Sequence, residues 1–422
     1  MDPYNSPVTS SLKEEELREE LARIRNTASF QFGFHFVQAA QRPWKILALP
    51  VTTPLLLFNL LRKKKKQKEK SPLEPRDCIL VFSTDSARGL HHDRSEALIE
   101  NLSNRTTQLI HVTTEANIPK GSDKNVLRYS IPSRAVTKNM SAKVWNQQCE
   151  TMLNCILDIF APKTFVFDGD YPFRGLLNAI SIREGMNRYW IRESPNNHKI
   201  SQLPLDGFDI FDAILHPTIT KTTDPDVNIG RSGSIFCNPI IGSTPQKEDR
   251  KAFRSLHTSD NVQLIFVDIG PTLPIADLVI SSLQAQENLR LLIRPQGHPK
   301  SLLSHPKTVV AHDLSYAEAL AYADAAVLYP DQYSLHTAIN AQTPTLSIFN
   351  STSTKSGVSE PDFPGDLPLI HLDQSLDEKL ILEAIQRLID PAVQVQLKEQ
   401  LDEVGFSYDQ QKLTDFLMQL HQ

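Results

Sequence analysis

The chain has 422 residues, of which 40% are hydrophobic and 22% are charged, as in folded globular proteins and unlike collagen-like or disordered chains. Its 44 basic and 49 acidic residues give a formal net charge of −5, which excludes a generally basic protein that binds nucleic acid. Four scattered cysteines without a CxxC pair favour the cytosol. The sequence also lacks GxxxxGK(S/T), GxGxxG and HExxH patterns, so the usual features of P-loop NTPases, dehydrogenases and zinc proteases are missing.

The leading segment has the pattern of an extension. Apolar residues recur at helical spacing over 11–26, which predicts an amphipathic helix. An apolar run follows, shorter than the roughly 20 residues of a membrane-spanning helix, and Pro50 and Pro54 interrupt it before the basic cluster RKKKKQKEK. We therefore expect residues 1–70 to form a helical extension with a polybasic linker, in which 28–70 binds an anionic membrane surface. Alternatively, the lysines are a solvated linker and the apolar run packs on the protein's own body.

From Cys78 onward, short apolar runs alternate with helical patterns, which is typical of parallel sheets covered by helices on both faces. We predict an α/β fold of two doubly wound domains, residues 76–240 and 241–422, that face each other across a cleft. The stretch 217–244, rich in Pro, Thr, Gly and Asn, is the expected crossing between them. The expected strands are CILVFS, QLIHVT, TFVFD and RYWIR, then QLIFVDI, LRLLIRP, TVVA, AAVLYP and TPTLSIF. Helices are expected at 94–102, 142–160, after 174, and at 275–286, 315–323, 333–341, 377–389, 392–404 and 408–420.

Four stretches of the chain resemble those of a known family. They are GLHHDRSEAL after the first strand, FDGDYPFRGLLNAI, the strand QLIFVDIGP, and YADAAVLYPDQYSLHTAINAQTPTLSIF. In this order they resemble a GT-B glycosyltransferase of the MurG-like class, of the bacterial surface-polysaccharide type, over most of the chain from Cys78 onward. The sequence departs from the family at the donor block, where Asp331 stands in a turn that usually holds small residues and Thr337 stands where a carboxylate is usual. Gln342 also replaces the usual glycine.

The resemblance implies transfer of a sugar, of the hexosyltransferase type. The donor would be a nucleotide-sugar, which we expect to be UDP-linked, and the acceptor a lipid-linked or polysaccharide molecule of the cell envelope. Neither a cofactor nor a metal is expected, and nucleic acid is not an expected partner. We expect the protein to be cytoplasmic and peripheral on the inner face of the cell membrane, since the leading segment would hold the site near its acceptor.

The expected catalytic residues are two adjacent histidines. His91 and His92 follow the first strand, near the carboxyl edge at which ligands of such sheets bind. An imidazole that titrates near neutrality can take the proton of the acceptor hydroxyl. His92 aligns best with the family histidine, so the resemblance implies His92 as the base and His91 as the second candidate. Alternatively, either one caps the helix or contacts solvent.

The departing diphosphate needs positive groups. Gly270 and Thr272 lie between a strand and a helix, where free amide groups and the helix dipole can face an anion. Arg294 ends another strand and can add a bidentate contact. Alternatively, Gly270 and Thr272 belong to an ordinary strand-to-helix turn, and Arg294 forms a surface ion pair.

Other polar residues are candidates for binding donor or acceptor. Ser334, His336 and Thr337 begin the donor helix and can bond ribose or sugar hydroxyls, and Asp331 can replace the missing carboxylate. Alternatively, Asp331 and Ser334 form a turn and a helix cap. The acceptor-side candidates are Asp168 and Arg174, which either bind acceptor or pair with each other and fix the loop between them.

Two further functions stay open from the sequence. One is a sugar-nucleotide epimerase of related architecture, which would gain nothing from the leading hydrophobic and polybasic segment. The other is a non-catalytic binding or scaffold protein of polysaccharide assembly, which the altered donor block around Asp331, Thr337 and Gln342 suggests.

Overall fold

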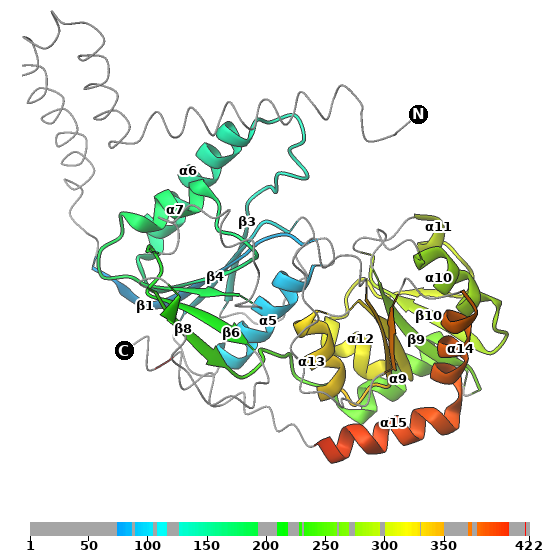
Figure 1. Ribbon diagram of the computed structural model, residues 1–422. Coiled ribbons are helices and arrows are strands. Elements are labelled where there is room, and N and C mark those ends of the chain that lie inside the picture. The colour runs from blue at the N-terminus through cyan, green and yellow to red at the C-terminus, as the bar shows by residue number, and fades with distance from the viewer. Residues whose placement is uncertain are drawn as a thin grey trace, which may run out of the picture.

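The computed structural model shows two lobes, each built on a sheet with helices packed against it (Figure 1). The described residues are 74–86, 89–103, 108–115, 126–192, 209–217, 228–229, 232–259, 261–269, 275–295, 300–329, 331–349, 370–373, 378–404 and 418. The expected extension 1–70 and nearly all of the helix expected at 408–420 lie outside these residues. In the described part of the chain, no helix is both long and apolar enough to cross a membrane.

The first lobe holds an eight-stranded sheet with the order β3-β2-β1-β4-β5-β6-β8-β7. Its strands are β1 (Arg76–Ser83), β2 (Leu109–Thr113), β3 (Val126–Ser130), β4 (Pro162–Asp168), β5 (Asn187–Ile191), β6 (Ala213–Pro217), β7 (Asn228–Ile229) and β8 (Ser232–Cys237). Only the edge pair β7 and β8 is antiparallel among these strands. Its helices are α5 (Leu90–Ser103), α6 (Ala142–Phe160) and α7 (Arg174–Ser181).

The central strand β1 shows why the sequence forms this lobe. Its last six residues are all buried, as expected for a parallel strand covered on both faces. Leu80 and Phe82 join the core that contains residues of α6 and α7, whereas Ile79 and Val81 join the core that contains residues of α5. Alternate side chains of one strand therefore fill two opposite cores.

Helices α6 and α7 approach each other unusually closely. A Cβ added at Gly175 would lie 2.2 Å from the carbonyl oxygen of Asn146, so no larger residue fits there without moving the backbone. The Gly175 amide donates to the Asn146 side chain over 2.7 Å. This contact fixes the start of α7 and, with it, the loop that follows β4.

The second lobe holds a six-stranded parallel sheet with the order β11-β10-β9-β12-β13-β14. Its strands are β9 (Gln263–Asp268), β10 (Leu289–Ile293), β11 (Thr308–Val310), β12 (Ala325–Leu328), β13 (Thr345–Phe349) and β14 (Ile370–Asp373). Its helices are α9 (Lys247–His257), α10 (Ala276–Ala285), α11 (Lys300–Leu303), α12 (Tyr316–Tyr322), α13 (Gln332–Asn340), α14 (Glu378–Ile389) and α15 (Pro391–Val404).

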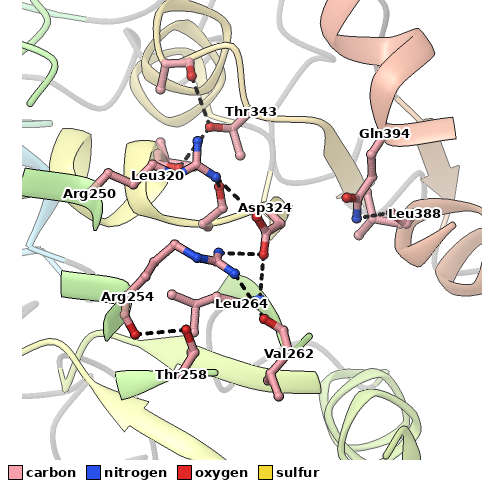
Figure 2. Close-up of polar contacts among 12 residues, drawn as sticks. Arg250, Arg254, Thr258, Val262, Leu264, Leu320, Asp324, Thr343, Leu388 and Gln394 are labelled. Carbon is pink, nitrogen blue, oxygen red and sulfur yellow. Dashed lines mark hydrogen bonds and ion pairs between the residues drawn. The ribbon is translucent and has the colours of Figure 1, made fainter. Parts of the chain in front are cut away.

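Helix α9 follows the first sheet in the chain but is bound to the second lobe. Arg254 pairs with Asp324 over 2.7 Å, and Arg250 reaches the other oxygen of the same carboxylate over 3.1 Å. Figure 2 shows both guanidinium groups converging on Asp324, which also accepts the amide of Leu264 at the start of β9. The carboxylate of Asp324, just before β12, thus joins this strand to α9 and to β9.

The predicted α/β fold of two doubly wound domains is confirmed, and each of the nine expected strands is present. The stretch 217–244, expected as the crossing between the domains, also contains β8, which pairs in parallel with β6. Ile235 and Cys237 of β8 pack against the core of the first lobe. Small and polar residues around them obscure the strand pattern in the sequence.

The two lobes are in contact through α5 and α13. Figure 1 shows these helices side by side between the two sheets. A second contact joins Glu100 of α5 to Ser243, whose hydroxyl and amide both donate to the carboxylate. Helix α5 therefore belongs to the first lobe but faces the second, which places its residues where both domains can act on one ligand.

Candidate functional site

The expected catalytic histidines lie in the first turn of α5. Gly89 precedes this helix with a φ of 73°, a left-handed conformation that glycine adopts without strain. The amide of Leu90 donates to the Ser86 hydroxyl over 2.8 Å, which satisfies one of the free amides at the helix start. His91 and His92 follow directly.

His91 forms a pair with a carboxylate. Its Nε2 lies 3.4 Å from Oδ1 of Asp170, and its Nδ1 lies 3.0 Å from the hydroxyl oxygen of Thr84. Burial acts to lower the pKa of His91, but the hydrogen bond to Asp170 and the charges of Asp168 and Asp170 outweigh it, so the pKa is raised. The Asp170 side chain is 79% exposed, so the pair has a side open to solvent. His91 thus has a stabilised charged form and can accept a proton.

His92 has different surroundings. It is 3% exposed, and its ring stacks on that of His111 with the centroids 5.1 Å apart. Neither of its ring nitrogens has a hydrogen-bond partner. Burial lowers the pKa of His92 to about 3, so the ring is neutral at physiological pH and holds a proton weakly. The role of His92 as base stays a prediction, and these surroundings favour His91.

His111 connects His92 to an ion pair. Its Nδ1 lies 2.6 Å from Glu96 and its Nε2 lies 2.9 Å from the hydroxyl of Ser83. Arg128 donates to both oxygens of Glu96, over 3.1 and 2.7 Å. Burial acts to raise the pKa of Glu96, but the hydrogen bonds from His111 and Arg128 prevail and the pKa is lowered. The carboxylate is therefore ionised across the physiological range.

The same residues include a possible set of metal ligands. Ligand atoms of His92, Glu96 and His111 lie within 4.8 Å of one another, and two imidazoles with a carboxylate are ligands that zinc accepts. Both oxygens of Glu96 are already bound by Arg128, however, and that guanidinium would place a positive charge beside the metal. We therefore describe this cluster as a hydrogen-bonded ion network and assign no metal to it.

Asp168 binds a residue other than the expected one. Its carboxylate accepts two bonds from the Arg94 guanidinium and one from the Ser95 hydroxyl, and it is fully buried. Arg174, in contrast, is exposed at the start of α7. Asp168 therefore fixes α5 to the end of β4, and the alternative of a mutual pair with Arg174 is corrected. A direct role of either residue in binding acceptor stays a prediction.

Arg294 forms a buried pair between the two lobes. Both terminal nitrogens of its guanidinium donate to the carboxylate of Asp93 on α5, and the guanidinium carbon lies 5.5 Å from the ring centroid of Tyr316. The alternative of a surface ion pair is thus wrong, because Arg294 is buried at the contact between the domains. Asp93 takes one bond from each terminal nitrogen, so a diphosphate that binds this guanidinium either uses its remaining N–H groups or displaces Asp93.

The donor helix α13 uses its polar side chains internally. Asp331 caps the helix and accepts both the amide and the hydroxyl of Ser334, over 2.8 and 2.5 Å. The Thr337 hydroxyl donates to the carbonyl of Tyr333 over 2.7 Å. His336 is buried, which lowers its pKa to about 3. The alternative reading of Asp331 and Ser334 as a cap is confirmed, and contacts of these residues with a donor stay predictions.

The remaining donor candidates lie beyond what the structure describes. Gly270 and Thr272 fall in the undescribed stretch 270–274, between β9 and α10. Their predicted contact with an anion is therefore still a prediction.

Sequence reasoning missed the residue that pairs with His91. Asp170 lies in FDGDYPF, the stretch from which we selected Asp168 and Arg174. One signal could have found it: Asp168 ends a continuous apolar strand, whereas Asp170 stands two residues beyond, in the loop. Polar residues just past the carboxyl end of a strand are the ones that reach a ligand.

Strand order explains why these residues meet. β4 lies between β1 and β5, with Ser83 of β1 and Ile191 of β5 both in register with Asp168. The segments that follow the three strands therefore emerge side by side at one edge of the sheet. His91 comes from the first segment and Asp170 from the second, beside the contact of α5 with α13. The arrangement brings an imidazole and a carboxylate together near the domain contact.

Comparison with known proteins identifies the fold. No protein-family model matches the sequence, and no curated protein matches it significantly. Spinosyn forosaminyltransferase SpnP is 10% identical, over 81% of this chain and 98% of its own, with a TM-score of 0.53. UGT89C1 of Arabidopsis thaliana, solved with quercetin, is 9% identical over 81% of this chain and 99% of its own, with a TM-score of 0.52. MurG of Acinetobacter baumannii is 12% identical, over 82% of this chain and 100% of its own, with a TM-score of 0.47.

The first two structures establish that this chain has the GT-B fold, as the sequence resemblance implied. The likeness covers nearly the full length of both proteins.

Proposed function

We propose that this protein is a glycosyltransferase that moves a sugar from a nucleotide-sugar to a hydroxyl of an acceptor. The observation that carries the proposal is the pair of His91 and Asp170, which lies at the carboxyl edge of the first sheet in a GT-B fold. Helix α5, which holds His91, also contacts α13 of the second domain. A base on one domain would then face a donor bound to the other.

The proposed reaction uses His91 as the general base. The acceptor hydroxyl would give its proton to Nδ1 of His91, in place of the Thr84 hydroxyl now 3.0 Å away, while Nε2 keeps its contact with Asp170. The acceptor oxygen then forms a bond to the anomeric carbon of the donor sugar. The bond from that carbon to the nucleoside diphosphate breaks, and the diphosphate leaves with the bonding electrons. Asp170 stabilises the imidazolium that forms, since its hydrogen bond raises the pKa of His91.

The donor is proposed to be UDP-linked and to bind the second domain. Gly270 and Thr272 would contribute backbone contacts to the diphosphate, and Asp331, Ser334, His336 and Thr337 would lie beside the ribose or sugar. Because the hydroxyls of Ser334 and Thr337 already donate within α13, they would meet a ligand as hydrogen-bond acceptors. Arg294 would add its charge either through its remaining N–H groups or after the donor displaces Asp93.

The acceptor is proposed to be lipid-linked or part of a polysaccharide, with the protein held at the inner face of the cell membrane by 28–70. The cluster RKKKKQKEK supports this proposal, because basic residues near an anionic leaflet contribute about 1 kcal/mol each. Flotation with anionic liposomes tests it. The full chain should float and a chain lacking 1–70 should not, and equal flotation of both would exclude this membrane contact.

The test of the catalytic proposal is a transfer assay. The full-length protein is incubated with a panel of UDP-sugars, and release of UDP is followed together with the mass of the product. His91→Ala should lower turnover by roughly 10² to 10⁴-fold, the usual contribution of a general base. His257→Ala, at the end of α9 and beside Arg290 near the start of β10, is the matched control and should leave turnover unchanged. Equal turnover of the wild type and His91→Ala would rule out this base.

One observation favours a non-catalytic binding protein as a second candidate. The hydroxyls of Ser334 and Thr337 are bonded within α13 and its cap, and the usual carboxylate at Thr337 is absent. Such a protein would be stabilised by UDP-sugars without turning any of them over. A product that is an epimer of the donor, with no transfer, would instead indicate an epimerase.

A further inference from the structure

A buried arginine near His91 has an unused guanidinium. Arg192 directly follows β5 and is 5% exposed. Both terminal nitrogens of its guanidinium are buried and have no hydrogen-bond partner. Its backbone amide donates to the carbonyl of Leu215 over 2.8 Å, so the chain holds this residue against the end of β6.

The other buried arginines of the described chain are different. Arg94 pairs with Asp168 and Arg294 pairs with Asp93, each through two nitrogens. Leaving a buried cation without such a partner is costly. The guanidinium carbon of Arg192 lies 5.4 Å from the ring centroid of Trp190, but a cation–π contact offsets only part of that cost. The fold therefore maintains an unpaired cation that an anion would stabilise.

The position of Arg192 relates it to the proposed reaction. Ile191 is in register with Asp168, so Arg192 and the segment 169–171 leave neighbouring strands at the same edge of the sheet. Burial lowers the pKa of Arg192, and the charges of Tyr171 and Asp170 oppose this effect, so these groups are near it. The Asp170 carboxylate itself binds His91. The free guanidinium thus lies near the carboxylate that binds the proposed base.

We propose that Arg192 binds an oxyanion of the acceptor, a phosphoryl or carboxylate group close to the hydroxyl that receives the sugar. The planar guanidinium, with both terminal nitrogens free, fits two oxygens of such a group at once. The assignment of this anion to the acceptor rests on the proposed function, because it assumes that His91 is the base. The proposed acceptor is therefore anionic near its reacting hydroxyl.

Thermal melting of the full-length protein tests the binding site. UDP is first added at saturation, so that a donor site is filled, and inorganic pyrophosphate or succinate is then titrated in separate arms. At least one of the two anions should raise the melting temperature of the wild type by about 2–4 °C at saturation. Arg192→Met should abolish this shift. Arg76→Met, at the exposed arginine that begins β1 at the opposite edge of the sheet, is the control and should retain it.

The two arms separate the classes of anion. A shift with pyrophosphate alone assigns a phosphoryl group to the acceptor, and a shift with succinate alone assigns a carboxylate. If neither anion gives a shift that depends on Arg192, the proposal is overturned. Arg192→Lys keeps the charge but loses the planar fork, so it should weaken binding of the active anion at least tenfold.

A structural role of Arg192 makes a different prediction. If Arg192 is an unpaired cation, Arg192→Met should melt no lower than the wild type without added anion, because the replacement removes a charge and no partner. Arg192→Met could instead melt below the wild type or fail to fold while Arg192→Lys binds the anion normally. That combination would mean that the side chain serves the fold, and it would overturn the proposal.

The proposed function can fail separately. If UDP raises the melting temperature of every variant but no anion shift depends on Arg192, the inference alone is wrong. If UDP stabilises none of them, donor binding is wrong, and the titrations without UDP still show whether Arg192 binds an anion.

Discussion

His91 and Asp170 determine how the proposed reaction depends on pH. His91 must be neutral to accept a proton, so kcat/KM should rise as pH passes above its raised pKa. Asp170→Asn removes the carboxylate that raises this pKa. The acidic limb of the pH profile should therefore move to lower pH in Asp170→Asn, with a lower plateau because the imidazolium is less stabilised. A profile that keeps its midpoint would contradict the role given to Asp170.

Glu96 should stabilise the fold in a pH-dependent way. Its pKa is lowered in the folded protein by bonds from His111 and Arg128, against the effect of burial. The stabilisation is therefore present above the unfolded pKa of about 4.3 and is lost as pH falls through the folded pKa. Glu96→Gln should lower the free energy of unfolding by roughly 1–3 kcal/mol at pH 7.

Urea denaturation of the wild type and Glu96→Gln, at a series of pH values, measures this effect. The difference between the two proteins should shrink below about pH 4, where the unfolded carboxylate is protonated. If the stability difference between the wild type and Glu96→Gln grows as pH falls, the stabilising role given to the ionised Glu96 carboxylate is contradicted.

At the scale of single residues, the sequence predicted where the candidate side chains gather but not which partners surround each one. Histidines after a strand could be placed near the sheet edge from the chain order alone. Which of His91 and His92 can act as a base depends on Asp170 and His111, which arrive from β4 and β2. Such partners are distant in sequence, and burial, which lowers the pKa of His92, exists only in the folded protein.

Helix α9 should depend strongly on one carboxylate for its attachment, although Phe253 also stacks on Tyr322 of α12. Asp324 binds Arg250 and Arg254, and no residue of α9 is buried (Figure 2). Asp324→Ala should therefore release α9 and lower the free energy of unfolding by roughly 1–3 kcal/mol. Hydrogen exchange measures the release, with faster exchange expected over 247–257 and unchanged exchange in β1. Unchanged exchange over 247–257 would show that other contacts hold the helix.

The elements that the sequence predicted share one property. Central strands such as β1 and β9 are continuous apolar runs that follow from burial on both faces. Helix α9 was missed because its residues are polar and it is held by ion pairs. Strand β8, next to the edge of its sheet, was missed because its apolar residues are few. Burial alone does not make an element detectable, because the sequence also missed β6, whose five residues are all buried.

The pair of Asp93 and Arg294 should matter for the molecule as a whole, because it joins the two domains. Asp93→Asn leaves the buried Arg294 without its bidentate partner, with only the more distant charge of Asp268 to offset it, which should lower the free energy of unfolding by roughly 3–5 kcal/mol. The double variant Asp93→Leu with Arg294→Met removes both charges and should recover most of that loss. Glu100→Gln, at the exposed contact with Ser243, is the control and should cost less than about 1 kcal/mol. Equal losses in Asp93→Asn and the double variant would contradict this account of the pair.

Two domains were predictable from two series of strands, but their contact was not. Asp93 and Arg294 are 201 residues apart, and each looks like an ordinary surface charge in its own segment. The sequence suggested Arg294 for the departing diphosphate because it ends a strand. The structure shows that Asp93 of the first domain already binds it, so the donor and the domain contact would share or compete for one guanidinium.

Hydrogen exchange of the full-length protein with and without UDP tests most directly whether a nucleotide binds where the two domains meet. If it does, exchange should slow at the start of α13 in the second domain and at the start of α5 in the first, around His91. Unchanged exchange at both helices, at a UDP concentration that saturates any measurable binding, would contradict a nucleotide site at this contact.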